Sequence, residues 1–247
     1  SRDGITPTVL PVGDQPPRML DTPEWLTLEV KDPDRLTAFY DAFLELDIVE
    51  ERDEETVLGA GETELRLRAP GPVPRGGLHT HYALTVPTRE YGDWYDRLDE
   101  RFDLVEHSFG DARSLYFYDP EGNCVELGER PLDADRSGVT GLFELVLEVE
   151  HLAGAVNFYE RLGFEVVDDD REEGRVRLTT GEFDLELWSP RLGLADARGG
   201  VHVDFGVAAE DPSSIAREVA DDALAVTSVE EGVRIRDPDG HYVTLVA

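Results

Sequence analysis

The sequence predicts an α+β protein built from four similar modules in tandem, and two observations support that prediction. Each half of the chain repeats the other, because landmarks of the first half recur about 120 residues later in the second. Each half also repeats internally, since Phe39 and Tyr40 are echoed by Trp94 and Tyr95. The modules begin near residues 24, 79, 143 and 201. The paired landmarks are residues 25–30 with 144–149, Phe39-Tyr40 with Phe158-Tyr159, His81 with His202, and Asp119-Pro-Glu-Gly with Asp237-Pro-Asp-Gly.

Each module has the pattern of a strand, a helix and then further strands. In the first module Leu26, Leu28 and Val30 alternate with Trp25, Thr27 and Glu29, which predicts a strand buried on one face. Apolar residues at helical spacing predict a helix between Asp34 and Leu46, with Asp32 or Asp34 as its N-cap. The two Asp-Pro-x-Gly sequences predict tight turns, because proline fixes φ and glycine accepts a positive φ.

The repeats divide the chain into four segments. Residues 1–21 are proline-rich without periodicity and are expected to form an extended arm. Residues 22–130 form the first predicted domain, residues 131–139 a linker, and residues 140–247 the second domain. Each domain would contain two of the modules.

The charge composition excludes several classes of partner. The formal net charge is -32, so nucleic acid and anionic membranes are unfavourable partners. Lys31 is the single lysine, and such carboxylate-rich, lysine-poor chains resemble cytoplasmic proteins of extreme halophiles. One cysteine, Cys124, excludes a disulfide framework within the chain. With no long apolar run and no signal-peptide pattern, we expect a cytoplasmic protein.

The paired modules, the Asp-Pro-x-Gly turns and the strand-opening histidines together resemble the vicinal oxygen chelate superfamily, of glyoxalase, bleomycin-resistance and extradiol dioxygenase type. The resemblance covers roughly residues 22–247 and is closest to two-domain, catechol-type extradiol dioxygenases. It implies βαβββ modules, and each pair of modules would form a curled mixed sheet with helices outside. We expect each half to contribute the eight strands of one such sheet, with a metal inside the trough.

The resemblance also implies four ligand positions in each trough. In the first half these are Trp25, Arg66, His81 and Glu126, of which His81 and Glu126 are candidate metal ligands. Trp25 stands where the metalloenzymes usually have a histidine, and an indole cannot ligate a metal. Trp25, Arg66, Tyr116 and Tyr118 are candidates for lining a substrate site. His79 is a conceivable third donor, because strand alternation places it on the face of His81.

In the second half the matching positions are Glu144, Glu186, His202 and Thr244. The first three are candidate metal ligands, and this set resembles the four-ligand His/Glu pattern of glyoxalase-type enzymes. Asp204 shares a strand face with His202. For each carboxylate the alternative is a solvated or hydrogen-bonded group in an acidic protein. The remaining histidines, His107, His151 and His241, are interpreted as surface residues.

Three functions stay open from the sequence. The first is a metal-dependent enzyme, with ring cleavage of a catechol-like molecule by Fe(II) as the leading hypothesis. The second is a non-catalytic binding or resistance protein whose troughs hold a small molecule without metal. The third is a glyoxalase-like isomerase or lyase using Mn, Ni, Zn or Co. No catalytic residue is assigned, the partner is a small-molecule ligand, and the chain is expected to be a monomer or homodimer with at most one metal.

Overall fold

The computed structural model describes residues 20–71, 77–190 and 202–247, so most of the predicted arm lies outside the described residues. In the first half the elements are β1 (Leu20–Glu29), α1 (Pro33–Leu44), β2 (Ile48–Arg52), β3 (Glu55–Ala60), β4 (Thr63–Arg68), β5 (His79–Pro87), the short 3-10 helix η1 (Thr88–Glu90), α2 (Tyr91–Asp99), β6 (Val105–Phe109), β7 (Ala112–Tyr118) and β8 (Cys124–Arg130). In the second half they are β9 (Gly141–Glu148), α3 (Leu152–Leu162), β10 (Glu165–Asp170), β11 (Arg175–Thr179), β12 (Asp184–Trp188), β13 (His202–Ala209), α4 (Pro212–Val219), β14 (Ala225–Val229), β15 (Gly232–Arg236) and β16 (Tyr242–Val246). The predicted order of strand, helix and further strands is confirmed in all four modules.

The strands form two eight-stranded mixed sheets, which confirms the predicted α+β fold of paired βαβββ modules. One sheet has the order β14-β15-β16-β13-β1-β4-β3-β2, and the other β10-β11-β12-β9-β5-β8-β7-β6. The expectation that each half builds its own sheet is wrong. The first module shares a sheet with the fourth through antiparallel β1 and β13, and the second shares a sheet with the third through β5 and β9. We call these the 1/4 sheet and the 2/3 sheet.

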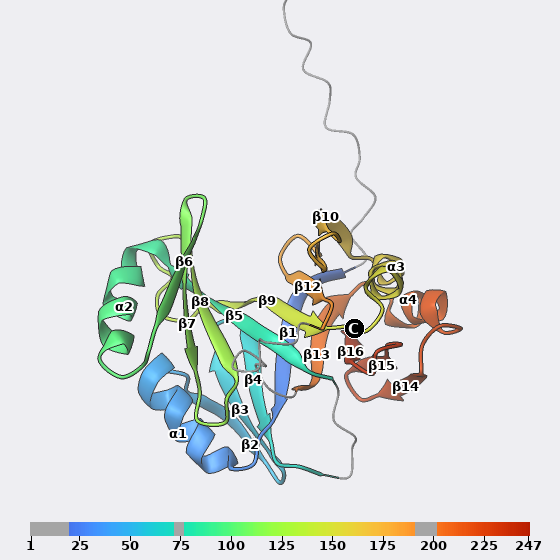
Figure 1. Ribbon diagram of the computed structural model, residues 1–247. Helices are drawn as coiled ribbons and strands as arrows, with labels where there is room; N and C mark the ends of the chain where they lie inside the picture. The colour runs from blue at the N-terminus through green and yellow to red at the C-terminus, as the bar shows by residue number, and fades with distance from the viewer. Residues whose placement is uncertain (1–19, 72–76, 191–201) are drawn as a thin grey trace, which may run out of the picture.

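The helices lie outside the sheets, with α1 and α2 on one side of the molecule and α3 and α4 on the other (Figure 1). The two modules of each half therefore pack together although their strands belong to different sheets. Phe39 of α1 lies against Phe117 of β7, with ring centroids 6.5 Å apart. Each half thus has packing contacts between its own two modules, whereas each sheet combines strands from both halves.

The repeated landmarks contact each other in the same way in both halves. The Tyr40 hydroxyl donates to Asp119 Oδ2 at 2.8 Å, and the Tyr159 hydroxyl donates to Asp237 Oδ2 at 2.9 Å. Each aspartate opens an Asp-Pro-x-Gly turn, so a buried tyrosine of a helix fixes the turn that precedes the last strand of the next module. Asp32 is the N-cap of α1, accepting from Arg35 N at 3.1 Å. No helix in the described ranges is long and apolar enough to span a bilayer.

Candidate metal centre and its pocket

The 2/3 sheet gathers four of the predicted ligand positions around one point. Ala83 on β5 pairs with Glu126 of β8 on one side and with Glu144 of β9 on the other. Val146, two residues after Glu144, is flanked in the same way by His81 and Glu186. The two halves of the chain each contribute two positions, because β5 and β8 come from the first half and β9 and β12 from the second.

Three of these side chains converge closely enough to hold one metal ion. His81 Nε2 lies 3.1 Å from Glu126 Oε2 and 3.3 Å from Glu144 Oε1. One ligand atom from each residue lies within 4.8 Å of the others, and all three residues are buried. Glu126 Oε2 has no well-directed hydrogen bond although it is fully buried. A buried carboxylate in that state is stabilised by a facing cation, which here is protonated His81 or a metal ion bound by this donor set.

The electrostatics of the triad reflect two carboxylates that share one imidazole. Burial lowers the pKa of His81, but its contacts with Glu126 and Glu144 more than offset this and raise the pKa to about 9. Burial raises the pKa of Glu126, and the facing His81 outweighs it, so that this pKa is lowered. A protonated His81 thus occupies the position where a metal ion would balance the two carboxylates.

Two arginines of β11, Arg175 and Arg177, form ion pairs with carboxylates of the site. Arg177 Nη2 lies 3.1 Å from Glu144 Oε2 and 4.0 Å from Glu186 Oε1. Arg175 Nη1 donates to Glu186 Oε1 at 3.0 Å. Glu186 is therefore adjacent to the triad and paired with guanidinium groups, and it would have to exchange that pairing to become a fourth ligand.

A cavity of about 440 Å³ lies beside the triad. His81 and Glu144 are among its lining residues, and so are Tyr116 and Tyr118 of β7, two of the predicted substrate-lining residues. The Tyr116 ring meets His81 edge-on, with centroids 5.5 Å apart. Burial, followed by the nearby Glu126, raises the pKa of Tyr116, so its hydroxyl stays protonated and can donate to a bound oxygen.

Sequence reasoning missed other residues of this cavity. His107 of β6 is exposed, as the sequence predicted, but it also lines the cavity, and its ring lies 5.5 Å from that of Tyr116 between centroids. Phe109 of β6 and Trp188 of β12 also line it. The alternation of Val105, His107 and Phe109 is a strand signal that could have placed all three on one face.

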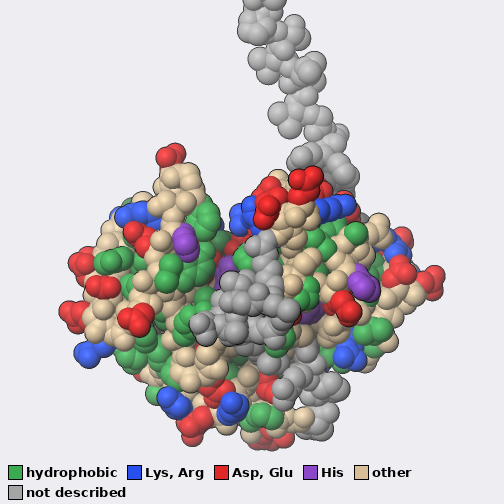
Figure 2. All heavy atoms as spheres, in the orientation of Figure 1, with side chains coloured by type: hydrophobic (Ala, Val, Ile, Leu, Met, Phe, Trp, Pro, Cys, Tyr) green, Lys and Arg blue, Asp and Glu red, His purple; other side chains and the backbone are tan. Residues whose placement is uncertain are grey.

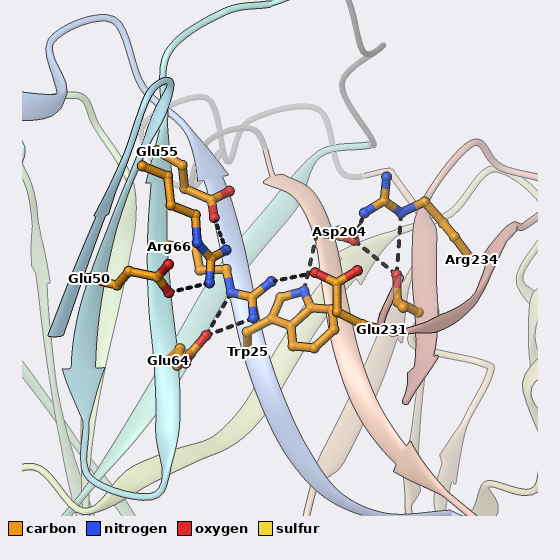
Figure 3. Close-up of polar contacts among 10 residues, drawn as sticks. Trp25, Glu50, Glu55, Glu64, Arg66, Asp204, Glu231 and Arg234 are labelled. Carbon is orange, nitrogen blue, oxygen red and sulfur yellow. Dashed lines mark hydrogen bonds and ion pairs between the residues drawn. The ribbon is translucent and has the colours of Figure 1, made fainter. Parts of the chain in front are cut away.

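The 1/4 sheet contains the equivalent positions, but these residues satisfy one another (Figure 3). Gly206 of β13 pairs with Trp25 and with Thr244, as Ala83 pairs with the two glutamates. Asp204 accepts hydrogen bonds from Trp25 Nε1 at 3.3 Å and Thr244 Oγ1 at 2.9 Å. Arg234 Nη2 lies 2.9 Å from the same carboxylate. This cluster has its own positive charge and donors, so it does not require a metal.

Trp25 and Arg66 belong to this second cluster and do not line the cavity beside His81. The Arg66 guanidinium lies 3.8 Å from the Trp25 ring centroid, and its Nη2 lies 2.7 Å from Glu64. Trp25 points to the inner face, as predicted, opposite Leu26 and Leu28. The expectation that Trp25 and Arg66 share a trough with His81 and Glu126 is therefore wrong, because β1 and β4 lie in one sheet and β5 and β8 in the other.

His202 does not lie with Glu144 and Glu186. The register places His202 opposite Leu28, whereas Asp204 takes the place that His81 has in the other sheet. The predicted division into two donor sets, one for each half, is thus corrected: Glu144 and Glu186 join His81 and Glu126. His202 stacks on His241 with ring centroids 5.2 Å apart, and His241 is buried rather than a surface residue.

His79 is also directed away from the triad. Its ring lies 5.5 Å from that of His202 and 5.9 Å from that of Tyr82, measured between centroids. It is not one of the side chains that converge with His81 in the described part of the chain. His151, the remaining histidine, precedes α3 and is exposed as predicted.

Comparison with known proteins identifies the superfamily of the chain. Residues 22–127 match the model of the Glyoxalase/Bleomycin resistance protein/Dioxygenase superfamily. A metallothiol transferase FosB of Staphylococcus saprophyticus is 30% identical over 116 residues, which cover 44% of this chain and 77% of that relative. The chain belongs to the glyoxalase/bleomycin resistance/dioxygenase superfamily. A FosB of Staphylococcus haemolyticus is 28% identical over 109 residues, covering 41% of this chain and 78% of the relative.

Solved structures show that the fold extends over both halves of this superfamily member. A putative dioxygenase from Bacillus subtilis matches with a TM-score of 0.75 and 18% identity, covering 93% of this chain and 86% of that one. Glyoxalase I from Zea mays matches with a TM-score of 0.66 and 17% identity, covering 91% and 92%. At these identities the likeness shows the fold alone.

Proposed function

We propose that this chain is a divalent-metal-dependent enzyme of glyoxalase type with its active site in the 2/3 sheet. The observation that carries the proposal is the convergence of His81, Glu126 and Glu144 beside a cavity, with Glu186 adjacent. One histidine and three carboxylates correspond to the four-ligand His/Glu pattern of glyoxalase-type enzymes. The site is complete within one chain, so neither a monomer nor a homodimer is required by it.

The donors favour a metal of intermediate hardness. Imidazole suits Zn, Ni and Fe, whereas carboxylates suit Mn and Mg, so a mixed set fits Mn, Co, Ni or Zn. Bound there, the metal would polarise a substrate oxygen as a Lewis acid. The names of the FosB relatives, which are metallothiol transferases, support metal-dependent chemistry on a small molecule.

The protein's own groups have separable roles in such a site. His81, Glu126 and Glu144 would hold the metal, and Arg177 would fix the orientation of Glu144 through its contact at 3.1 Å. Tyr116 would donate a hydrogen bond to a substrate oxygen. Glu186 is a candidate general base or fourth ligand, depending on whether it keeps its hydrogen bond to Arg175.

Extradiol ring cleavage by Fe(II) takes second place. The aromatic cavity beside the triad favours it, and a catechol-like substrate would fit there. The donor set opposes it, because non-haem Fe(II) oxygenases typically use two histidines and one carboxylate. The triad has one histidine, and the second histidine on β5, His79, points elsewhere.

Metal titration tests the proposal. Protein freed of metal with a chelator and kept in molar salt would be titrated by calorimetry with Mn(II), Co(II), Ni(II) and Zn(II). We expect one site per chain, and Glu126→Gln should weaken it by more than the roughly 10- to 100-fold that loss of a supporting contact costs. Asp204→Asn is the matched control, because Asp204 is the 1/4-sheet equivalent of His81, and this variant should bind metal like the wild type.

Two outcomes would overturn the assignment. Failure of all four metals and of anaerobic Fe(II) to bind would leave a binding protein without metal. Equal loss of binding in Glu126→Gln and Asp204→Asn would place the metal elsewhere. Tight Fe(II) binding with oxygen uptake on adding catechol would instead favour the extradiol function.

A further inference from the structure

The cavity beside the candidate metal centre has an unusually apolar wall for so acidic a protein. Its outer part is built by β6, β7 and the end of β12, and the wall consists of Val105, His107, Phe109, Tyr116, Tyr118 and Trp188. Val105, Phe109 and Tyr118 are 51%, 55% and 41% exposed, so these apolar surfaces meet solvent when the cavity is empty. Figure 2 shows hydrophobic surface and histidine over the β6 and β7 part of the molecule, beside a hollow. Exposed apolar surface gathered in a concavity marks a ligand site.

The outer wall offers an anionic ligand no positive charge among its described residues, and the His81 imidazole beside it is already shared by Glu126 and Glu144. None of the described residues that line the cavity is a lysine or an arginine, while Asp103 and Glu144 contribute carboxylates. The nearest arginines of the triad, Arg175 and Arg177, are engaged by Glu186 and Glu144. A carboxylate or a phosphonate placed against this outer wall would therefore be desolvated without a counter-ion, which is costly.

The remaining polar groups of the cavity are neutral or weakly polar. Cys124 is a buried free cysteine, and its thiol is a weakly polar part of the wall. Aromatic faces and edges dominate the rest, and they pack best against another flat ring. His107 and the tyrosine hydroxyls can each make a hydrogen bond to a polar substituent on such a ring.

We propose that the cavity selects substrates whose reacting oxygen is attached to an uncharged aromatic ring system, and that it rejects anionic ones. The inference rests on the proposed active site for the direction in which the oxygen points, toward His81 and Glu144. The ring would lie between β6 and β7 on one side and Trp188 on the other. Phe109 is then a specificity-determining residue, because it forms the outer wall and carries no polar group.

A matched pair of ligands tests this selectivity without requiring turnover. Naphthalenemethanol and naphthoate share one ring system and differ in charge. Binding of each would be measured by calorimetry and by tryptophan fluorescence in molar salt, on wild-type protein with a chelator and again with Mn(II). We expect the alcohol to bind at least about tenfold more tightly than the carboxylate in the chelated protein.

Variants show where the aromatic alcohol binds. Comparison with metal binding shows whether this inference or the metal-site proposal has failed. Phe109→Ser should weaken the alcohol several-fold, and Phe109→Arg should reverse the preference toward naphthoate. Val226→Ser is the control, because Val226 is an exposed strand residue, 42% accessible, on β14 of the other sheet. Metal binding without alcohol binding would refute this inference and leave the metal site standing, whereas alcohol binding without metal would do the reverse. Equal affinity for both ligands, or equal effects of Phe109→Ser and Val226→Ser, would also refute it.

Discussion

Gly206→Ala directly tests the close packing around Trp25 and Asp204 in the 1/4 sheet, which we call the filled cluster. Gly206 lies under the Trp25 indole, and a Cβ added there would meet three ring atoms at 2.5 to 2.6 Å. Ordinary contact of a Cβ begins at 3.4 Å, so the indole would have to withdraw by almost 1 Å. Trp25 is only 3% exposed and is held by Arg66 on one side and Asp204 on the other, so it has little freedom to move.

The expected loss of stability follows from these contacts. Overpacking a well-filled interior costs about 1–3 kcal/mol. Withdrawal of the ring also breaks the hydrogen bond from Trp25 Nε1 to Asp204, and a buried polar group left unpaired costs about 1–3 kcal/mol. The free energy of unfolding should therefore fall by about 2–6 kcal/mol. For a chain of this size each kcal/mol lowers the melting temperature by about 2–4 °C, so a decrease of roughly 4–24 °C is expected.

Thermal and urea unfolding in molar salt, followed by circular dichroism, would measure the change. Gly92→Ala is the control, because nothing lies within 4 Å of a Cβ at that helical position, and it should be neutral or slightly stabilising. The cost of Gly206→Ala should shrink in a Trp25→Leu background, since the clash is then removed. Metal affinity should not change. A Gly206→Ala protein as stable as Gly92→Ala would refute the filled cluster.

Three further predictions concern charge, pH and stoichiometry. At net charge -32, the melting temperature should rise between dilute buffer and molar KCl, because the Debye length falls from about 10 Å at 0.1 M to 3 Å at 1 M; no rise would contradict the halophilic interpretation. Burial, then His241 and His79, lower the pKa of His202 well below its usual 6.5. The free energy of unfolding should therefore decrease as the pH falls below 6.5, because the unfolded chain then binds a proton that the folded protein does not. The urea midpoints at pH 7 and pH 5 should thus differ more for wild type than for His202→Gln. An equal difference in the two proteins would contradict this prediction. Elemental analysis of protein purified in high salt without chelator should find at most one metal per chain, and two would contradict the asymmetry of the sheets.

Equivalent positions in the two sheets carry different side chains with different interactions. In the 2/3 sheet the positions hold His81, Glu126, Glu144 and Glu186, and one ligand atom from each of the first three lies within 4.8 Å of the others. In the 1/4 sheet Asp204 is balanced by Arg234 and hydrogen-bonded by Trp25 and Thr244. The difference supports one active site and one closed cluster in each chain.

The sequence by itself determined the modules and most of the candidate ligands. Strand alternation around Leu26 and the spacing of Phe39 and Tyr40 are local patterns, and local patterns survive in any tertiary arrangement. His81, Glu126, Glu144 and Glu186 were each predicted as candidate ligands because the resemblance to the superfamily implies ligand positions there.

Only the tertiary structure decided which positions share a trough. Pairing of β5 with β9 rather than with β1 depends on contacts between strands distant in the sequence, and similar modules offer similar edges to either partner. The sequence prediction placed His202, and not Asp204, at the position equivalent to His81, and this was wrong for a related reason. Both lie on one face of β13, since side chains alternate with a period of two, and only the register against β1 shows that Asp204 is the equivalent of His81.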